Sequence, residues 1–424
     1  MWRLGYSLLL WLMLPWVLAR LWWRGRREPG YRYRIGSRFG IYQPRSPAQA
    51  RPLIWVHAVS VGETRAAQPL VEALLQTYPG HDLLLTQMTA SGREAARQLY
   101  GAAERVHLAW LPYDYACAAR RFLGHFRPSL GIVMETEIWP NLLAECAAAK
   151  LPLLLANGRL SLRSADRYAL VEPLVRTALS RFSVIAAQTE ADAEQFRRLG
   201  AQRLEVAGNL KFDVAPPPEA AVLAAEFRRR YGPRKALLAA SLREGEERLI
   251  IDAMQAAGGL AQNALLVIVP RHPQRFDEVA GLLSGKGLAF VRRSQEWDVP
   301  LDCPCVLGDS MGEMAAYYAA CDCAFIGGSL LEYGGQNLIE ACAAGVPALI
   351  GPHTYNFSEA VEAAIAAGAV LRVADAASVI ETANRLLGND ERRLRIGDAG
   401  LDFCRRHQGA TARTVDLCQR LLQP

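Results

Sequence analysis

Three carboxylates and one lysine stand where apolar runs of this sequence give way to polar residues. Glu63 closes the polar segment His57–Glu63, and Glu135 and Glu137 follow the apolar stretch that ends at Met134. Lys211 stands out because the chain otherwise uses arginine for almost all of its basic residues. A carboxylate can take a proton from a reacting group, and a flexible ammonium can contact a carboxylate or a phosphate. These residues are candidates for acid–base chemistry and for anion binding.

Each of these residues also has an ordinary structural interpretation. A glutamate in the first turn of a helix is stabilised by the helix dipole, which alone would explain Glu63. Glu135 and Glu137 could pair with one of the many arginines. His57 and Ser60 lie at the same strand end as Glu63, and this polar cluster favours a general base there.

A second group of candidates lies in the C-terminal half and suits a nucleotide. Arg271 stands in a turn with prolines on both sides, and arginine is a bidentate ligand for phosphate. The segments Gly308–Glu313 and Gly327–Ser329 each follow an apolar run, and Gly334-Gly335 precedes the start of a helix. Backbone N–H groups of such glycines can bind an anion, and Glu340 can accept hydrogen bonds from ribose hydroxyls. The spacing is not the dinucleotide fingerprint.

Composition excludes several classes of protein. The chain has 424 residues, of which 51% are hydrophobic and 21% charged, so it is neither disordered nor a disulfide-stapled mini-protein. A net charge of +6 spread over this length does not indicate a nucleic-acid-binding protein. No P-loop, zinc-protease helix or serine-hydrolase elbow occurs.

The nine cysteines do not indicate a metal site. They are odd in number and scattered, which favours a reducing compartment. The two Cys-x-Cys pairs, Cys303 with Cys305 and Cys321 with Cys323, lack the usual zinc-ligand spacing, so we interpret them as buried thiols. The sequence also lacks an Asp-x-Asp pair, so we expect no metal and no cofactor.

Short apolar runs alternate with helix-length segments along most of the chain. Runs that are apolar throughout predict parallel strands covered by helices on both faces, so we expect an α/β fold with two doubly wound sheets. The first half has runs at 53–59, 82–88, 106–111, 130–134, 151–156, 184–187 and 204–207. The second half has runs at 236–240, 265–269, 288–291, 306–308, 324–326, 348–350 and 370–373.

These patterns predict two Rossmann-like domains, which we expect to face each other across a cleft. Residues 29–213 form the first and 221–424 the second, joined by the proline-rich linker 214–220. The last helix of the chain is a candidate to pack back on the first domain. Ligands of open α/β sheets bind beyond the carboxyl ends of the strands, where the candidate residues fall.

Residues 1–28 predict a membrane-anchor helix and the start of a basic collar. The apolar stretch 4–23 has about the length of a spanning helix, but Pro15 and Arg20 suit a helix lying in the interface equally well. Because the arginines follow the apolar stretch, an uncleaved anchor is favoured over a signal peptide. Trp22, Trp23 and these arginines indicate a cytoplasmic boundary and a contact with membrane lipid.

Eight motifs in one order resemble those of the bacterial 3-deoxy-D-manno-octulosonic acid (Kdo) transferases. They are HAVSVGE, METEIWPN, LANGRLSLRS, GNLKFD, PRHPQRF, GDSMGEM, FIGGSLLEYGGQN and GPHTYNF. The resemblance spans nearly the whole chain and implies a GT-B fold. It also implies inverting, metal-independent transfer of Kdo from CMP-Kdo to a lipid A precursor, lipid IVA, in lipopolysaccharide core biosynthesis. The expected location is the cytoplasmic face of the inner membrane.

The resemblance implies a role for individual residues. Glu63 matches the general base, and Glu135 and Lys211 match positions of transition-state stabilisation. Together with the glycine-rich segment, the residues expected to hold CMP are Pro270, Arg271, Met311, Gly312, Glu313, Gly327, Gly328, Ser329, Asn337, Leu338, Ile339 and Glu340. The chain departs from the family pattern at Gln336, where histidine is usual, and at Leu338, where proline is usual.

Two other functions stay open on the sequence. One is a different GT-B glycosyltransferase that uses another activated sugar on a lipid acceptor. The other is a catalytically silent nucleotide-binding protein of envelope assembly, although the joint presence of Glu63, Glu135, Lys211 and Arg271 argues against it.

Overall fold

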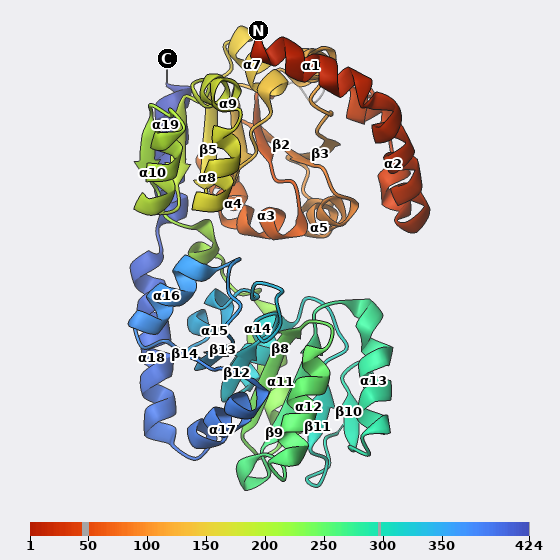
Figure 1. Cartoon of the computed structure of the whole chain (residues 1–424), viewed down its shortest axis with the longest axis vertical. Helices are drawn as coiled ribbons and strands as arrows, with labels where there is room; N and C mark the ends of the chain where they lie inside the picture. Colours follow the sequence, from red (N-terminus) through yellow and green to blue (C-terminus); the bar gives the residue numbers. More distant parts are fainter. Residues whose placement is uncertain (45–50, 296–297, 424) are drawn as a thin grey trace. The chain divides into compact units, whose positions relative to one another are not determined.

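The chain folds into two compact units. The computed structural model describes residues 1–44, 51–295 and 298–423. Unit 1 comprises Met1–Val214 with His407–Pro424, and unit 2 comprises Ala215–Arg406 (Figure 1). The boundary after Val214 falls at the first residue of the proline-rich segment 214–220.

Unit 1 is built on a seven-stranded, fully parallel sheet with the strand order β3-β2-β1-β4-β5-β6-β7. The strands are β1 (Leu53–His57), β2 (Asp82–Gln87), β3 (Val106–Trp110), β4 (Leu130–Met134), β5 (Leu153–Gly158), β6 (Val184–Ala187) and β7 (Leu204–Val206). Each apolar run predicted for this half therefore contains a strand. The order reverses at β1 and β4, which is the usual place for a ligand in such sheets.

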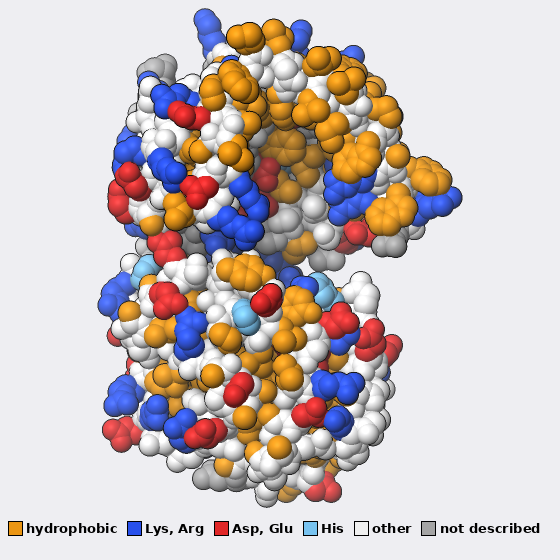
Figure 2. Space-filling model, in the orientation of Figure 1, with side chains coloured by type: hydrophobic (Ala, Val, Ile, Leu, Met, Phe, Trp, Pro, Cys, Tyr) orange, Lys and Arg blue, Asp and Glu red, His pale blue; other side chains and the backbone are white. Residues whose placement is uncertain are grey.

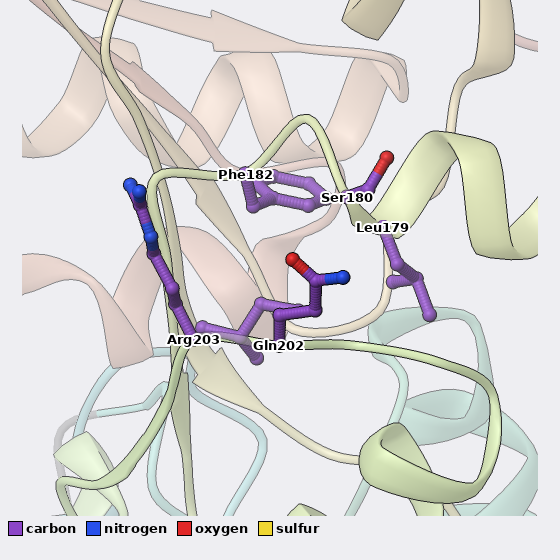
Figure 3. Close-up of a pocket in the computed structure, with 6 residues that line it drawn as sticks. Leu179, Ser180, Phe182, Gln202 and Arg203 are labelled. Carbon is purple, nitrogen blue, oxygen red and sulfur yellow. The ribbon is translucent and has the colours of Figure 1, made fainter.

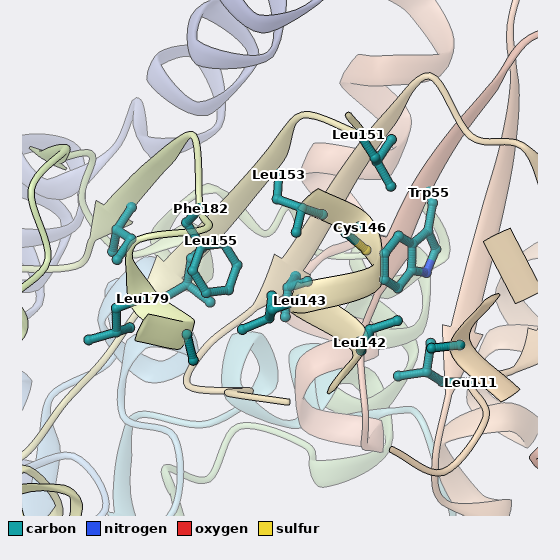
Figure 4. Close-up of a cluster of buried hydrophobic side chains, with 14 of the residues drawn as sticks. Trp55, Leu111, Leu142, Leu143, Cys146, Leu151, Leu153, Leu155, Leu179 and Phe182 are labelled. Atoms are coloured by element: carbon teal, nitrogen blue, oxygen red, sulfur yellow. The ribbon is translucent and has the colours of Figure 1, made fainter. Parts of the chain in front are cut away.

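Side chains of unit 1 alternate between two cores, one on each face of the sheet. Trp55 of β1 joins the core under α6 and α7, whereas Val56 joins the core under α4 and α19. Figure 4 shows the first core, in which Trp55, Leu143 and Cys146 lie together. The helices are α3 (Val61–Ala66), α4 (Gln68–Thr77), α5 (Ala90–Tyr100), α6 (Ala116–Phe126), α7 (Pro140–Ala148), α8 (Leu162–Ala169), α9 (Glu172–Leu179), α10 (Glu190–Arg198) and α19 (Ala410–Leu422).

The C-terminal helix α19 packs on unit 1, although unit 2 separates the two in sequence (Figure 1). Val415 and Cys418 of this helix are buried in the core that contains Val56. The Asp213 carboxylate accepts hydrogen bonds from the backbone N–H groups of Gly409, at 2.7 Å, and Thr411, at 2.6 Å. A carboxylate at a helix N-terminus satisfies N–H groups that lack partners within the helix. These two hydrogen bonds attach the N-terminus of α19 to the rest of unit 1.

The N-terminal apolar segment forms two helices instead of one. Helices α1 (Trp2–Leu12) and α2 (Leu14–Arg27) meet at an angle of 51°. Pro15 stands in the first turn of α2, and a proline there cannot continue a preceding helix. No single helix among the described residues is long and apolar enough to cross a membrane, but the bent pair meets that test by length and composition. Hydrophobic side chains gather over the two helices (Figure 2), and Trp2, Trp11, Trp16, Trp22 and Trp23 are exposed.

Unit 2 repeats the architecture of unit 1. Its parallel sheet has the order β10-β11-β9-β8-β12-β13-β14. The strands are β8 (Ala236–Leu242), β9 (Leu265–Pro270), β10 (Phe290–Arg292), β11 (Cys305–Leu307), β12 (Cys323–Ile326), β13 (Ala348–Ile350) and β14 (Val370–Arg372). The helices are α11 (Glu219–Tyr231), α12 (Glu246–Ala256), α13 (Phe276–Gly285), α14 (Met314–Ala320), α15 (Ile339–Ala343), α16 (Ser358–Ala366), α17 (Ala376–Leu387) and α18 (Asp390–His407). The structure thus has the two parallel α/β units that the sequence predicts.

Candidate active site

Glu63 is held by the turn that joins β1 to α3. Ser60 is the N-cap of α3, and its hydroxyl lies 3.0 Å from Glu63 Oε1, to which it donates. Glu63 Oε2 accepts a hydrogen bond from the backbone N–H of Val59 at 2.8 Å. Only 8% of Glu63 is exposed. This arrangement resembles a capping box, so the local sequence Ser60-Val61-Gly62-Glu63 by itself positions the carboxylate.

The surroundings of Glu63 favour its protonated form. Burial, followed by the negative charges of Glu135 and Glu137, raises the pKa of Glu63 to about 8. The hydrogen bonds from Val59 and Ser60 act in the opposite direction but do not cancel this rise. A carboxyl whose pKa lies near the working pH is suited to act as a general base.

Glu135 lies directly after β4 in a strained backbone conformation. Its φ angle of 57° is left-handed, which is rare for a residue with a side chain. Its Oε1 atom lies 3.7 Å from Lys211 Nζ, forming an ion pair. Strain of this kind persists where the surrounding structure enforces it, often at functional sites. The structure therefore brings together the three predicted catalytic residues, Glu63, Glu135 and Lys211.

Asn157 connects the end of β5 to the short helix η4 (Leu210–Asp213), which carries Lys211. The backbone of Asn157 is also left-handed, with φ of 55°, and its Oδ1 accepts a hydrogen bond from Leu210 N at 3.0 Å. Asn209 Oδ1 accepts from Lys211 N at 3.0 Å. Asn157 lies in the motif LANGRLSLRS, but the sequence gives it no role, because its contact with Leu210 joins residues that are distant in sequence.

Two other polar residues of this region have structural partners. Glu137 accepts a hydrogen bond from Trp139 Nε1 at 2.7 Å, and burial, followed by the charge of Glu135, raises its pKa. His57 is fully buried, and its Nδ1 lies 2.9 Å from Thr86 Oγ1. Burial lowers the pKa of His57 to about 4. His57 therefore belongs to the interior of unit 1, and the sequence-based argument that its presence marks a catalytic strand end is not supported.

Arg271 in unit 2 is oriented by Gln336. Arg271 Nε donates to Gln336 Oε1 at 3.2 Å, so the amide that replaces the usual histidine holds the guanidinium. Nearby, Arg243 Nη1 lies 3.1 Å from His272 Nε2, and the Arg243 guanidinium stands 4.7 Å from the centre of the Tyr333 ring. Burial and then the charges of Arg243 and Arg271 lower the pKa of His272. The basic group at this end of β9 is suited to bind an anion.

Glu246, which the sequence motifs do not single out, organises the glycine loop after β12. Its fully buried carboxylate accepts hydrogen bonds from three backbone N–H groups: Arg243 at 2.9 Å, Gly328 at 2.5 Å and Leu330 at 2.9 Å. The sequence signal was its position in the first turn of α12 after Gly245, but only the fold places it against the loop.

The glycines of this loop serve close packing, in contrast to the prediction of N–H groups free for an anion. A Cβ atom on Gly327 would lie 2.7 Å from the carbonyl oxygen of Ala240, so only glycine fits. The N–H groups of Gly327, Gly328, Gly335 and Gln336 all donate to acceptors within unit 2. Internal hydrogen bonding thus occupies these amides, because the loop folds tightly against β8.

The remaining residues predicted to hold CMP differ in accessibility. Met311 is exposed, and Glu313 accepts from Ser310 Oγ at 2.5 Å and Arg293 Nη2 at 3.0 Å. Asn337 Nδ2 donates to Glu340 Oε1 at 3.0 Å. Other predicted contacts can involve only backbone, because their side chains are buried in the core: Ser329, Leu338 and Ile339.

Unit 1 contains a pocket of about 140 Å³, which none of the predicted site residues lines (Figure 3). Two of the residues that line it are Phe182, two positions before β6, and Arg203, directly before β7. The pocket therefore opens at the amino ends of the strands, whereas Glu63, Glu135 and Lys211 follow the carboxyl ends. Within the described ranges, no group of three His, Cys, Asp or Glu residues is arranged to hold a metal ion.

Comparison with known proteins shows to which family this chain belongs. Residues 33–214 match the family model "3-Deoxy-D-manno-octulosonic-acid transferase (kdotransferase)", and residues 249–402 match "Glycosyl transferases group 1". The chain is 44% identical to a 3-deoxy-D-manno-octulosonic acid transferase of Bordetella pertussis, over 97% of each protein. It is 36% identical to one of Haemophilus influenzae, over 100% of this chain and 99% of that protein.

The chain belongs to the Kdo transferase family. As a member it is a glycosyltransferase, and its fold agrees with this assignment. The UDP-GlcNAc 2-epimerase of Neisseria meningitidis, solved with UDP-GlcNAc, has a TM-score of 0.60 at 16% identity, covering 87% of this Kdo transferase and 100% of the epimerase. At that identity the likeness concerns the fold alone.

Proposed function

We propose that this Kdo transferase moves Kdo from CMP-Kdo to a lipid A precursor, lipid IVA, in a single inverting displacement. Unit 1 supplies the base and unit 2 binds the donor nucleotide. The observation that carries this proposal is the Glu63 carboxyl, which is buried, doubly hydrogen-bonded, and close to the Glu135–Lys211 ion pair. No step of this mechanism requires a metal ion.

Glu63 would act as general base toward the acceptor hydroxyl. Its pKa of about 8 makes the ionised form a stronger base than an ordinary glutamate, while a useful fraction remains ionised near neutral pH. The hydroxyl loses its proton to Glu63 as its oxygen attacks the anomeric carbon of Kdo. The bond from that carbon to the CMP phosphate breaks at the same time, which inverts the configuration.

Charge on the departing CMP phosphate would be stabilised by arginine. The Gln336 amide orients Arg271 through its Nε, and the planar donors of a guanidinium match the oxygens of a phosphate in pairs. The carboxylate of Glu135, which pairs with Lys211, would stabilise the positive charge that develops on the Kdo ring. A hydrogen bond from the N–H of Glu135 to Ala156 O, at 2.9 Å, fixes its position after β4. In this proposal Lys211 orients Glu135.

We further propose that residues 1–28 anchor the enzyme to the inner membrane, with residues 29–213 acting on the acceptor and 221–424 on the donor in the cytoplasm. The exposed tryptophans of α1 and α2 support this location, because tryptophan prefers the boundary between lipid and water.

The test is transfer from freshly made CMP-Kdo to a tetra-acylated lipid A precursor, with chelator present and product mass as the readout. We expect one or more Kdo mass increments. The substitution Glu63→Gln should lower turnover by about 10²- to 10⁴-fold while CMP binding to the variant is unchanged. Glu94→Gln, at an exposed ion pair with Arg97, is the matched control and should keep full turnover. Unchanged turnover of Glu63→Gln would remove Glu63 from the mechanism.

A further inference from the structure

Arginines and aromatic rings alternate in one cluster of unit 1, which includes the last residue of β3 and one arginine of α2. The arginine–aromatic cluster consists, in order of contact, of Arg24, Tyr31, Arg38, Trp110, Arg93, Tyr33 and Arg34. Each guanidinium lies over at least one ring. The distances from guanidinium carbon to ring centre run from 3.9 Å, for Arg38 over Trp110, to 5.6 Å, for Arg38 over Tyr31.

Arg38, at the centre of the cluster, is a buried cation with unused hydrogen-bond donors. Only 1% of the residue is exposed. Its Nη1 donates to Met88 O at 3.1 Å, but its Nε and Nη2 have no partner among the described residues. Arg93 Nη1 is buried and unpartnered in the same way. Buried donors on a charged group are costly when they are left unsatisfied.

The rings do not account for these donors. A cation–π contact places a cation over the face of an aromatic ring, which is no hydrogen-bond acceptor of the oxygen or nitrogen type. The contact with Trp110 therefore stabilises the charge of Arg38, but Nε and Nη2 have no oxygen or nitrogen acceptor among the described residues.

The cluster also lacks a counterion within the part of the chain that the structure describes. None of the ion pairs found there involves Arg24, Arg34, Arg38 or Arg93. The remaining pairs lie in other parts of the two units. Burial lowers the pKa of Arg93, and the nearby charges of Arg34 and Arg38 lower it further. Like charges in this arrangement repel, so an anion would stabilise the cluster.

We propose that the arginine–aromatic cluster is a binding site for a phosphate-type oxyanion. The planar donors of a guanidinium match the oxygens of phosphate in pairs, and several arginines together favour that anion over a single carboxylate. Arg34 is exposed and Arg24 and Arg93 are half-buried, so they give the anion access, with Arg38 adding charge beneath them.

The position of the cluster suggests where the phosphate comes from. Arg24 belongs to α2, whose neighbouring Trp22 and Trp23 are exposed, and Arg26 lies 3.8 Å from the centre of the Trp22 ring. A phosphate in a lipid headgroup would lie at this depth beside an interfacial helix. A soluble phosphate could supply the same chemistry. The proposal concerns binding alone and does not rest on the transfer reaction.

Calorimetric titration of the full chain in a non-ionic detergent tests the proposal. The probes are inorganic phosphate, CMP, dihexanoyl phosphatidic acid and dihexanoyl phosphatidylcholine. We expect phosphatidic acid to bind, and the variants Arg34→Gln and Arg93→Gln each to weaken binding by about tenfold, the loss expected for charge-assisted hydrogen bonds. Added salt should also weaken it.

Arg167→Gln is the matched control, because Arg167 is an exposed arginine of α8 outside the cluster, and it should bind as the unchanged protein does. Binding of phosphatidic acid but not inorganic phosphate assigns the site to a lipid headgroup, whereas equal binding of both assigns it to phosphate in general. Absence of binding by any phosphate, or equal binding by Arg34→Gln and the unchanged protein, would overturn the proposal. Arg34 is exposed, so its variant is expected to fold even if Arg93→Gln is not.

Discussion

The candidate sites of the two units are stabilised in opposite ways. In unit 1, the negative charges of Glu135 and Glu137 act on Glu63, and the backbones of Glu135, after β4, and Asn157, at the end of β5, are left-handed. In unit 2, the Glu246 carboxylate has its negative charge fully hydrogen-bonded to backbone N–H groups, and Gln336 satisfies Arg271. Unit 1 thus holds the Glu63 carboxyl at a pKa near the working pH, whereas in unit 2 hydrogen bonds fix the conformation of the glycine loop after β12.

The largest effect should come from removing the carboxylate that holds the glycine loop after β12 in unit 2. Glu246→Ala leaves the N–H groups of Arg243, Gly328 and Leu330 without their acceptor, at about 1 kcal/mol or more each. We expect a loss of about 3 kcal/mol in the free energy of unfolding and a marked loss of CMP affinity. Chemical denaturation and calorimetry measure the two. Glu244→Ala, at an exposed position, should change neither, and normal CMP binding by Glu246→Ala would show that the loop does not need this carboxylate.

The second largest effect should be on the pH dependence of kcat/KM, which reports the pKa of Glu63 in unit 1. Glu63 is a base only when ionised, so with a pKa of about 8 the value of kcat/KM should rise about tenfold per pH unit below that point and level off above it. Glu135→Gln removes a negative charge that raises this pKa, so the midpoint should move to lower pH even if the maximum falls. Glu72→Gln, at an exposed site on α4, should leave the midpoint in place.

The same pKa has a consequence for stability. The pKa of Glu63 is about 8 in the folded state and 4.5 in the unfolded chain, so the folded state binds this proton more tightly. As the pH rises from 4.5 toward 8, Glu63 therefore lowers the free energy of unfolding. Glu63→Gln should flatten that part of the stability profile. An unchanged profile would mean that the carboxyl is not shifted.

The smallest effect should come from Gln336→His, which restores the usual family residue. A neutral imidazole can accept the Arg271 Nε–H bond, so donor KM should change by only about twofold to threefold near pH 8. Below pH 6 a protonated imidazole cannot accept that bond, and donor KM should become pH-dependent in the variant but not in the unchanged enzyme. Steady-state kinetics with varied CMP-Kdo measure this. A large effect at pH 8 would mean that Gln336 does more than orient Arg271.

The strands and the polar residues at their ends could be predicted because each depends on a local signal. Parallel strands buried on both faces are continuous apolar runs, and polar residues directly after such runs lie at the carboxyl edge of the sheet. Glu63 is a clear case, since Ser60 and Glu63 make their contacts within one turn. The bend of the N-terminal segment was not predicted, because Pro15 was interpreted as favouring an interfacial helix and not as a break between two helices.

The sequence by itself determined the family, the two parallel α/β units and the identity of the residues at the strand ends, because apolar periodicity and local capping need no knowledge of distant neighbours. Only the tertiary structure decided which partners those residues have. Glu246 lies 82 residues from Gly328, and Asp213 lies 196 residues from Gly409. Burial and charge at these long-range contacts set the pKa of Glu63, assign the loop glycines to packing and leave the donors of Arg38 unpaired.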